Sequence, residues 1–75
     1  MPAIGAIYKL AEADYRFGVG PLLVKITKIV SETVFDDEPW WDVEGLVKHP
    51  DYSGPGQERR LYLRAASLRN SRRPA

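Results

Sequence analysis

The sequence predicts a single, small, all-β domain that forms one five-stranded barrel. Three observations favour this fold class. Several segments alternate apolar and polar residues with a period of two, which is typical of strands that bury one face. Glycines and prolines separate these segments as turns do. The 75 residues leave room for one domain, and with no cysteine and a single histidine the chain has neither disulfides nor a multi-histidine zinc site.

The first two strands flank an acidic, aromatic loop. We expect the first strand at residues 6–10, and one helical turn over residues 10–15 is the alternative for the start of the loop. The clearest strand spans residues 22–30, a stretch rich in β-branched side chains that follows Pro21. One of its faces is expected to carry the alternating apolar residues Leu22, Val24, Ile26 and Val30, interrupted by Lys28, and the other face Leu23, Lys25, Thr27 and Ile29.

The third and fourth strands are expected at residues 40–47 and 58–64. In the third strand the alternation assigns one set to the core, namely Trp41, Val43, Gly45 and Val47. The intervening residues Trp40, Asp42 and Glu44 are then expected to face solvent. In the fourth strand Leu61 and Leu63 point one way, and Arg60, Tyr62 and Arg64 point the other.

The chain is expected to close with a single 3₁₀ turn at residues 65–67 and a short fifth strand near Leu68. Residues 70–75 are polar and have nothing apolar to bury, so they are predicted to be a disordered, arginine-containing tail. The domain therefore covers residues 1–69.

Charge is distributed unevenly along the chain. Residues 1–57 hold five Lys/Arg and nine Asp/Glu, a net charge of −4, whereas residues 58–75 hold six Arg and one Glu, a net charge of +5. An acidic body with an arginine-rich end can pair with itself or with a second copy of the chain, and the arginine-rich end can also attract an anionic partner. Because so small a domain has limited stability, we expect a weak homodimer or docking into a larger complex, with a plain monomer as the alternative.

Several segments resemble the SH3 family. The opening Ala6-Ile7-Tyr8-Lys9-Leu10 is similar to the family's first strand, and the loop at residues 11–17 is similar to its acidic, aromatic RT loop. The pair Trp40-Trp41 after an acidic turn is similar to the family's double tryptophan. The resemblance covers roughly residues 4–69. It implies an SH3-like barrel and a ligand contact by the first tryptophan.

A protein or peptide partner is the function that these features favour. An exposed tryptophan is a large, rigid anchor of the kind enriched at binding hot spots, and the alternative is that Trp40 packs under the loop around Tyr52. For the tyrosines, the alternative to a binding role is ordinary packing within the barrel. For the acidic residues, the alternative is a solvent-exposed turn without a ligand. The residues expected to form the binding surface are Trp40, Tyr8, Tyr15, Tyr62, Asp36, Asp37 and Glu38.

Nucleic-acid binding is the alternative function, because arginines at high density can grip phosphates. The residues that would do so are Arg59, Arg60, Arg64, Arg69, Arg72 and Arg73. We expect no catalysis, because His49 beside Asp51 has no nucleophile with motif support. No cofactor or metal is expected. The sequence contains no signal peptide and no apolar segment of membrane-spanning length, which predicts a cytoplasmic protein without membrane contact.

Overall fold

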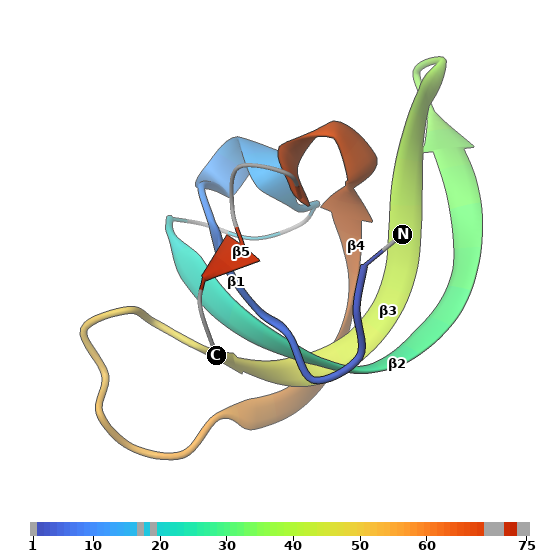
Figure 1. Cartoon of the computed structure of the whole chain (residues 1–75). Helices are drawn as coiled ribbons and strands as arrows, with labels where there is room; N and C mark the ends of the chain where they lie inside the picture. Colours follow the sequence, from blue (N-terminus) through green and yellow to red (C-terminus); the bar gives the residue numbers. More distant parts are fainter. Residues whose placement is uncertain (1, 17, 19, 69–71, 74–75) are drawn as a thin grey trace.

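The computed structural model describes residues 2–16, 18, 20–68 and 72–73 and is all-β (Figure 1). Besides strands, the described residues contain two 3₁₀ turns, η1 (Glu12–Asp14) and η2 (Ala65–Ser67). Within this described part, no helix has the length and apolar character needed to cross a membrane. The strands are β1 (Ile7–Leu10), β2 (Leu22–Phe35), β3 (Glu38–Lys48), β4 (Gln57–Arg64) and β5 (Arg72–Arg73).

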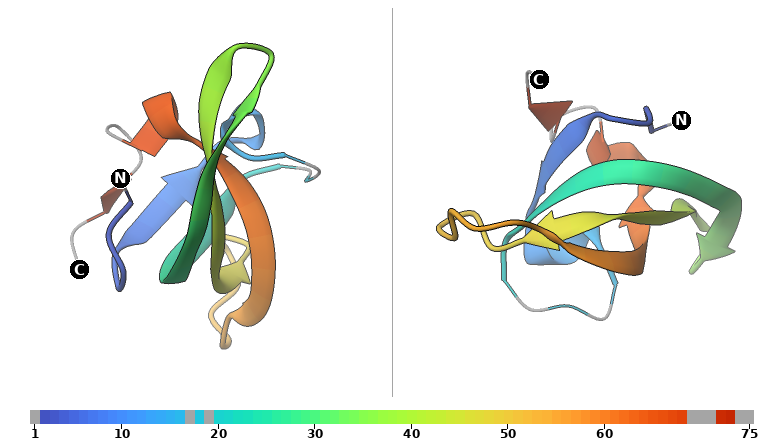
Figure 2. Two further views of the ribbon diagram at one scale, coloured as in Figure 1. Left: turned by 90° about the vertical axis from the view of Figure 1, so that its right-hand side faces the viewer. Right: turned by 90° about the horizontal axis from the view of Figure 1, so that it is seen from below.

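The sheet curls into a half-barrel rather than the closed five-stranded barrel predicted from the sequence (Figure 2). All neighbouring strands pair antiparallel in the order β4-β3-β2-β1-β5. The strands at the two ends of this order, β4 and β5, do not pair with each other in the described part of the chain. β5 comprises two residues and pairs with β1, so it lies at the end of the strand order that is opposite to β4.

Two bulges bend β2, and they explain one error of the sequence prediction. The register with β3 shifts between Ile26 and Lys28 and again between Ile29 and Ser31, so β2 carries an extra residue at each point. Each bulge reverses the alternation of faces. Ile29 therefore packs against the core, whereas Val30, which the alternation placed on the same face as Val24 and Ile26, is 38% exposed.

The β2–β3 hairpin is longer than predicted. β2 continues to Phe35, five residues beyond the predicted end, and the chain reverses through Asp36 and Asp37. Both aspartates have positive φ, of 53° and 62°, as a two-residue hairpin turn of type I′ requires. The tip projects away from the rest of the domain in Figure 1.

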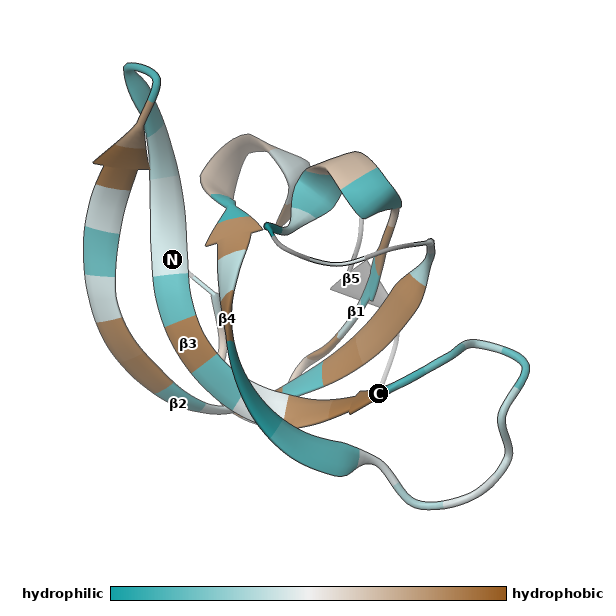
Figure 3. Ribbon diagram, turned by 180° about the vertical axis from the view of Figure 1, so that it is seen from behind, coloured by the Kyte–Doolittle hydropathy of each residue, from teal (hydrophilic) through white to brown (hydrophobic). Residues whose placement is uncertain are grey.

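The hydrophobic core fills the concave side of the curled sheet, and brown, apolar segments of the strands meet there in Figure 3. Tyr8, which we predicted to lie at the surface, is 3% exposed in this core, and its hydroxyl accepts a hydrogen bond from the Ala3 amide at 3.1 Å. Further core residues come from β1 to β4 and from the positions that follow the two 3₁₀ turns, and they are Leu10, Tyr15, Val24, Ile26, Val43, Val47, Leu61, Leu63 and Leu68.

The C-terminal segment differs from the prediction in two ways. The 3₁₀ turn at residues 65–67 is confirmed, but Leu68 is a buried core residue at the end of that turn rather than part of a closing strand. The last strand is Arg72–Arg73, within the segment predicted to be disordered, and it pairs with Tyr8 and Ile7. The other predicted tail residues, 70, 71, 74 and 75, lie outside the described residues, as does Arg69.

Candidate functional site

Trp40 lies on the outer face of β3, as its parity predicted, but it is buried rather than exposed. Its exposed fraction is 5%, because other side chains cover it. Phe35 meets the indole edge to face at 6.0 Å between ring centroids, and Phe35 also meets Tyr62 at 5.2 Å. The guanidinium groups of Arg16 and Arg64 lie 5.6 Å and 5.3 Å from the Trp40 ring centroid. Trp40 therefore cannot be the exposed anchor expected from the sequence.

The covering group comes from a distant part of the chain. Arg16 follows η1 and places its guanidinium 4.2 Å from the Phe35 ring centroid, a cation–π distance. The alternative packing of Trp40, under the loop around Tyr52, is also wrong, since Tyr52 is 55% exposed and the cover is Phe35 and two arginines. Of the predicted aromatic surface, only Tyr62 remains partly exposed on the outer face.

The predicted acidic residues lie at the hairpin tip. Asp36 and Asp37 form the turn and are exposed. Glu38 begins β3, and one of its carboxylate oxygens lies 3.2 Å from Nε of Arg64. Tyr8 and Tyr15 belong to the core, whereas the acidic residues lie at the hairpin, so the structure does not bring the predicted protein-binding residues onto one surface.

The arginines are divided between two opposite edges of the sheet. β4 carries Arg59, Arg60 and Arg64 at one edge, and β5 carries Arg72 and Arg73 at the other. Two of the three on β4 are already paired with carboxylates, Arg64 with Glu38 and Arg60 with Asp42. Arg59 is exposed, and its side chain forms no hydrogen bond or ion pair with any described residue.

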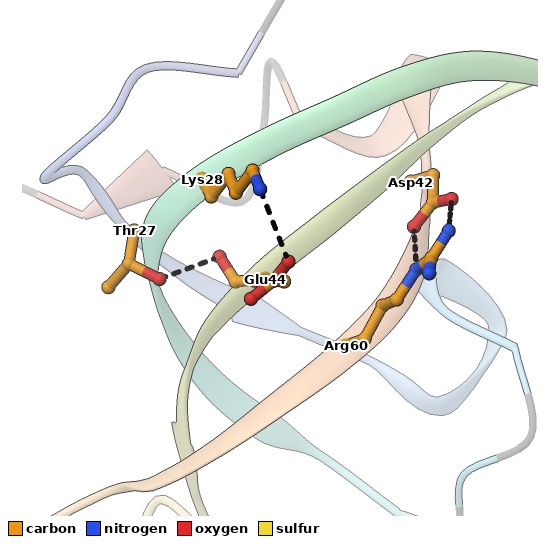
Figure 4. A network of polar contacts seen from close by, with 5 residues as sticks. All are labelled: Thr27, Lys28, Asp42, Glu44 and Arg60. Carbon is orange, nitrogen blue, oxygen red and sulfur yellow. Dashed lines mark hydrogen bonds and ion pairs between the residues drawn. The ribbon is translucent and has the colours of Figure 1, made fainter.

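Asp42 and Arg60 are the centre of a polar network on the outer face (Figure 4). Arg60 donates two hydrogen bonds to the carboxylate, which lower the pKa of Asp42 against the opposing effect of its burial. Nearby, the Lys28 ammonium lies 4.0 Å from a Glu44 carboxylate oxygen. Thr27, the extra residue of the first bulge, donates to the Glu44 carbonyl at 3.1 Å. The two ion pairs link β3 to β2 and to β4, and because each joins opposite charges they leave little net charge on this part of the outer face.

A groove lies between the loop after η1 and the β4 edge. Its volume is about 240 Å³, and we call it the loop–β4 groove. Its floor is apolar, with Leu22 and Val47 among the lining residues. Its walls carry the cations Arg16, Arg59 and Arg60 and the rings of Tyr15 and Tyr62.

Hydrogen bonds hold the loop wall of this groove in place. The Tyr15 hydroxyl donates to the Gly20 carbonyl at 2.7 Å, and the Gly20 amide donates to a Glu12 carboxylate oxygen at 3.1 Å. Gly20 has a φ of 75°, a conformation that favours glycine. Burial, and then the charge of Glu12, raise the pKa of Tyr15, while Arg59 lowers it. The hydroxyl is therefore a neutral donor that fixes the loop.

A larger hollow, of about 390 Å³, lies on the outer face beside the loop at residues 49–56. Ile7, Leu23 and Leu46 give it apolar walls, and Lys25 and Lys48 are the charged residues among those described around it. Lys48 is engaged with the Gly54 carbonyl at 3.2 Å. The residues described around this hollow include no aromatic ring, whereas the smaller groove combines two aromatic rings with Arg59, which has no ion pair among the described residues. The smaller groove is therefore the better candidate site.

Sequence reasoning identified several groove residues without recognising that they come together. Tyr15 and Tyr62 were assigned to an aromatic surface, and Arg59 and Arg60 to a nucleic-acid surface. Arg16 carried no sequence signal beyond its place in an acidic, aromatic loop. His49 lies on an exposed loop, where its Nδ1 accepts a hydrogen bond from the Asp51 amide at 3.2 Å. No three described His, Asp or Glu residues are grouped as a metal site would need.

Comparisons with protein-family models, with curated proteins and with solved structures found no match for this chain.

Proposed function

We propose that this chain is a non-catalytic interaction domain that binds an acidic segment of a protein partner in the loop–β4 groove. The observation that carries the proposal is Arg59, an exposed cation at the groove wall with no carboxylate partner among the described residues. A carboxylate placed there gains a charge-assisted hydrogen bond without displacing an existing ion pair. The apolar floor and the two tyrosine rings supply contact area beside it.

The fold supports the same class of function. The strand order, the long β2–β3 hairpin and the 3₁₀ turn before the last strand are compatible with an SH3-like barrel, and we propose that assignment. Many functions share that architecture, so the argument rests on the groove rather than on the fold. The charge of the groove differs from that of the binding surface expected from the sequence, because Asp36 and Asp37 lie at the hairpin tip and the groove is lined by arginines instead.

Nucleic-acid binding is supported less well by the charges on the sheet. A phosphate backbone needs several free cations along one path. Arg60 and Arg64 are tied to carboxylates, and β5 lies at the opposite edge of the sheet from Arg59.

The experiment is a selection of random linear peptides displayed on phage against the full chain. We expect enriched peptides to carry Asp or Glu and to lose at least about tenfold in affinity on Arg59→Glu, which corresponds to about 1.4 kcal/mol. The matched control is Lys9→Glu, the same charge reversal at an exposed position on β1. Peptides that bind Arg59→Glu as well as the wild type would overturn the proposal, as would tight binding of labelled single-stranded DNA that Arg59→Glu removes.

A further inference from the structure

The edge of β4 is open along the part of the strand that borders the groove. β4 has β3 on one side only, because it is the end strand of the sheet. On its other side the chain after η1 pairs with the C-terminal part of β4 through a bridge between Tyr15 and Leu63. On this side away from β3, the first half of β4, from Gln57, has no strand beside it in the described part of the structure. This half is teal, and therefore hydrophilic, in Figure 3.

The backbone direction along this edge follows from one hydrogen bond. The Arg16 amide donates to the Tyr62 carbonyl at 3.2 Å, so the Tyr62 carbonyl points away from β3. Alternate residues of a strand present their N–H and C=O groups to the same side. Glu58 and Arg60 therefore present theirs to the open edge, while the residues between them pair with β3. No described residue accepts from or donates to these outward groups of Glu58 and Arg60.

We propose that the partner's acidic segment binds as an additional antiparallel strand on this open edge. The inference rests on the proposed function and specifies how the groove is used. The Arg16–Tyr62 hydrogen bond is already the first backbone hydrogen bond of such a strand, and no described residue continues the pairing to Arg60 and Glu58. An added strand would continue the line with hydrogen bonds to Arg60 and Glu58, which is the way extended peptides join exposed sheet edges.

The side chains along the edge specify where the acidic residue lies. On an antiparallel pair, directly opposed residues share a face. The segment residue opposite Arg59 faces the loop–β4 groove, beside the one β4 arginine without an ion pair among the described residues. The next residues on either side face the outer surface, where Arg60 is held by Asp42. The preferred segment is therefore extended, with its Asp or Glu opposite Arg59.

A second copy of this chain is a poor occupant of the same edge. Consider two β4 strands that pair antiparallel about a two-fold axis. Their outward N–H and C=O groups face each other only when the axis passes through a residue, so that this residue lies opposite its own copy. An axis at Arg60 brings two arginines together, and an axis at Glu58 brings two glutamates together. An axis at Arg59 places Glu58 of each copy opposite Arg60 of the other. Arg60 is already held by Asp42, however, and the two Arg59 residues then lie directly opposite each other. Like charges directly opposite each other are destabilising, and charged edges are a common protection against self-pairing. An acidic partner segment meets no such repulsion.

The first test removes one of the two outward N–H donors of the edge, that of Glu58. Proline lacks the N–H, and it is tolerated at an edge strand where that N–H faces solvent. Glu58→Pro is expected to reduce the affinity of the selected acidic peptides at least about tenfold while β4 still pairs with β3. Glu58→Ala is the matched control, because it removes the same carboxylate and keeps the N–H, and it is expected to bind as well as the wild type.

The second test does not depend on the fold of a variant. N-methylation of single backbone amides in a selected peptide is expected to abolish binding at alternate positions and to leave binding intact at the positions between them. Binding that Arg59→Glu removes but that neither Glu58→Pro nor any N-methylation weakens would overturn strand addition and leave the proposed function standing. A selection that yields no Arg59-dependent peptide would overturn both. Wild-type chain that sediments as a dimer at low salt, and as a monomer after Glu58→Pro, would show that a second copy occupies the edge.

Discussion

Arg60 on β4 holds the buried carboxylate of Asp42 on β3 at two points, with its Nε 2.8 Å from Oδ1 and its second terminal nitrogen on Oδ2. Asp42 is 4% exposed, whereas the Arg60 side chain is 59% exposed. The pair links two neighbouring strands at the point where the outer face changes from aromatic to charged residues. The pKa of Asp42 is lowered chiefly by the Arg60 hydrogen bonds, and the pKa of Arg60 is raised by the same contacts.

This relationship predicts a pH-dependent difference in stability between the wild type and Arg60→Met. The variant is expected to be less stable at neutral pH, because it leaves Asp42 buried without a partner. The wild-type folded pKa lies below the ordinary value of 3.8, so the stability from this pair is present above that value and is lost as pH falls through the lowered pKa. In the variant, burial alone acts on Asp42 and raises its pKa, so the two proteins converge in acid.

Urea unfolding at a series of pH values measures this difference. The free energies of unfolding of wild type and Arg60→Met are expected to approach each other on either side of pH 3.8. Arg59→Met is the control, because its side chain has no ion-pair partner among the described residues, and it is expected to follow the wild type at every pH. A gap between Arg60→Met and wild type that is constant from neutral to acid pH would contradict the prediction.

Trp40 is expected to be a stability residue. Trp40→Ala removes a nearly buried indole and is predicted to lower the free energy of unfolding by about 3–5 kcal/mol. Trp40→Phe keeps a ring against Phe35 and removes a buried Nε1 that has no hydrogen-bond partner among the described residues, so its cost is expected to be much smaller. Trp41→Ala, at a partly buried ring, is expected to cost less than Trp40→Ala. Chemical denaturation of the three variants tests this order, and the reverse order for the two alanines would contradict it.

Gly45 is required where β3 passes closest to β2. A Cβ there would lie 2.6 Å from the Lys25 carbonyl oxygen and 2.8 Å from a Val24 methyl carbon, so backbone has to move. Gly45→Ala is predicted to cost about 1–3 kcal/mol, as overpacking of a filled core does. Gly54→Ala is the control, because its Cβ meets only the exposed ring of Tyr52, which can rotate away. Equal thermal midpoints for the two variants would refute this role.

The hairpin turn offers a stabilising substitution. Asp37 has a φ of 62°, which costs a residue with a Cβ about 1 kcal/mol and costs glycine little. Asp37→Gly is therefore predicted to raise the free energy of unfolding by up to about 1 kcal/mol, and Asp37→Val to lower it. Denaturation at high salt separates this backbone effect from the loss of a charge beside Asp36. A destabilised Asp37→Gly protein would show that the carboxylate contributes more than the turn geometry.

Local alternation predicted the strands whose register is regular. In β4, Leu61 and Leu63 are buried, and Arg60 and Tyr62 lie on the outer face, as their parity required. The same reasoning was wrong in β2, because a bulge leaves no mark in the pattern of apolar residues. The first bulge reverses the two faces, so that Ile29 packs against the core, and Val30 is the extra residue of the second bulge, after which the original alternation returns.

Parity also could not predict whether an outer face is covered. It assigned Trp40 to the correct face, but the cover comes from Arg16, which is distant in sequence, and from Phe35, beyond the predicted end of β2. The groove was missed for a related reason, since Tyr15 and Arg59 meet only when the loop folds against β4. β5 has no apolar signal, because its pairing with β1 uses backbone groups.

The pairing of β5 with β1 also constrains the order in which the sheet is completed. Ile7 lies opposite Arg73, so segments that are far apart in the sequence are neighbours in the sheet. Until residues 72 and 73 reach β1, β1 has β2 beside it and its other edge is unoccupied. A chain that has already formed β1 to β4 therefore still carries an exposed strand edge, to which another chain can pair. Truncating the chain before residue 72 would test how much of its solubility depends on this last contact.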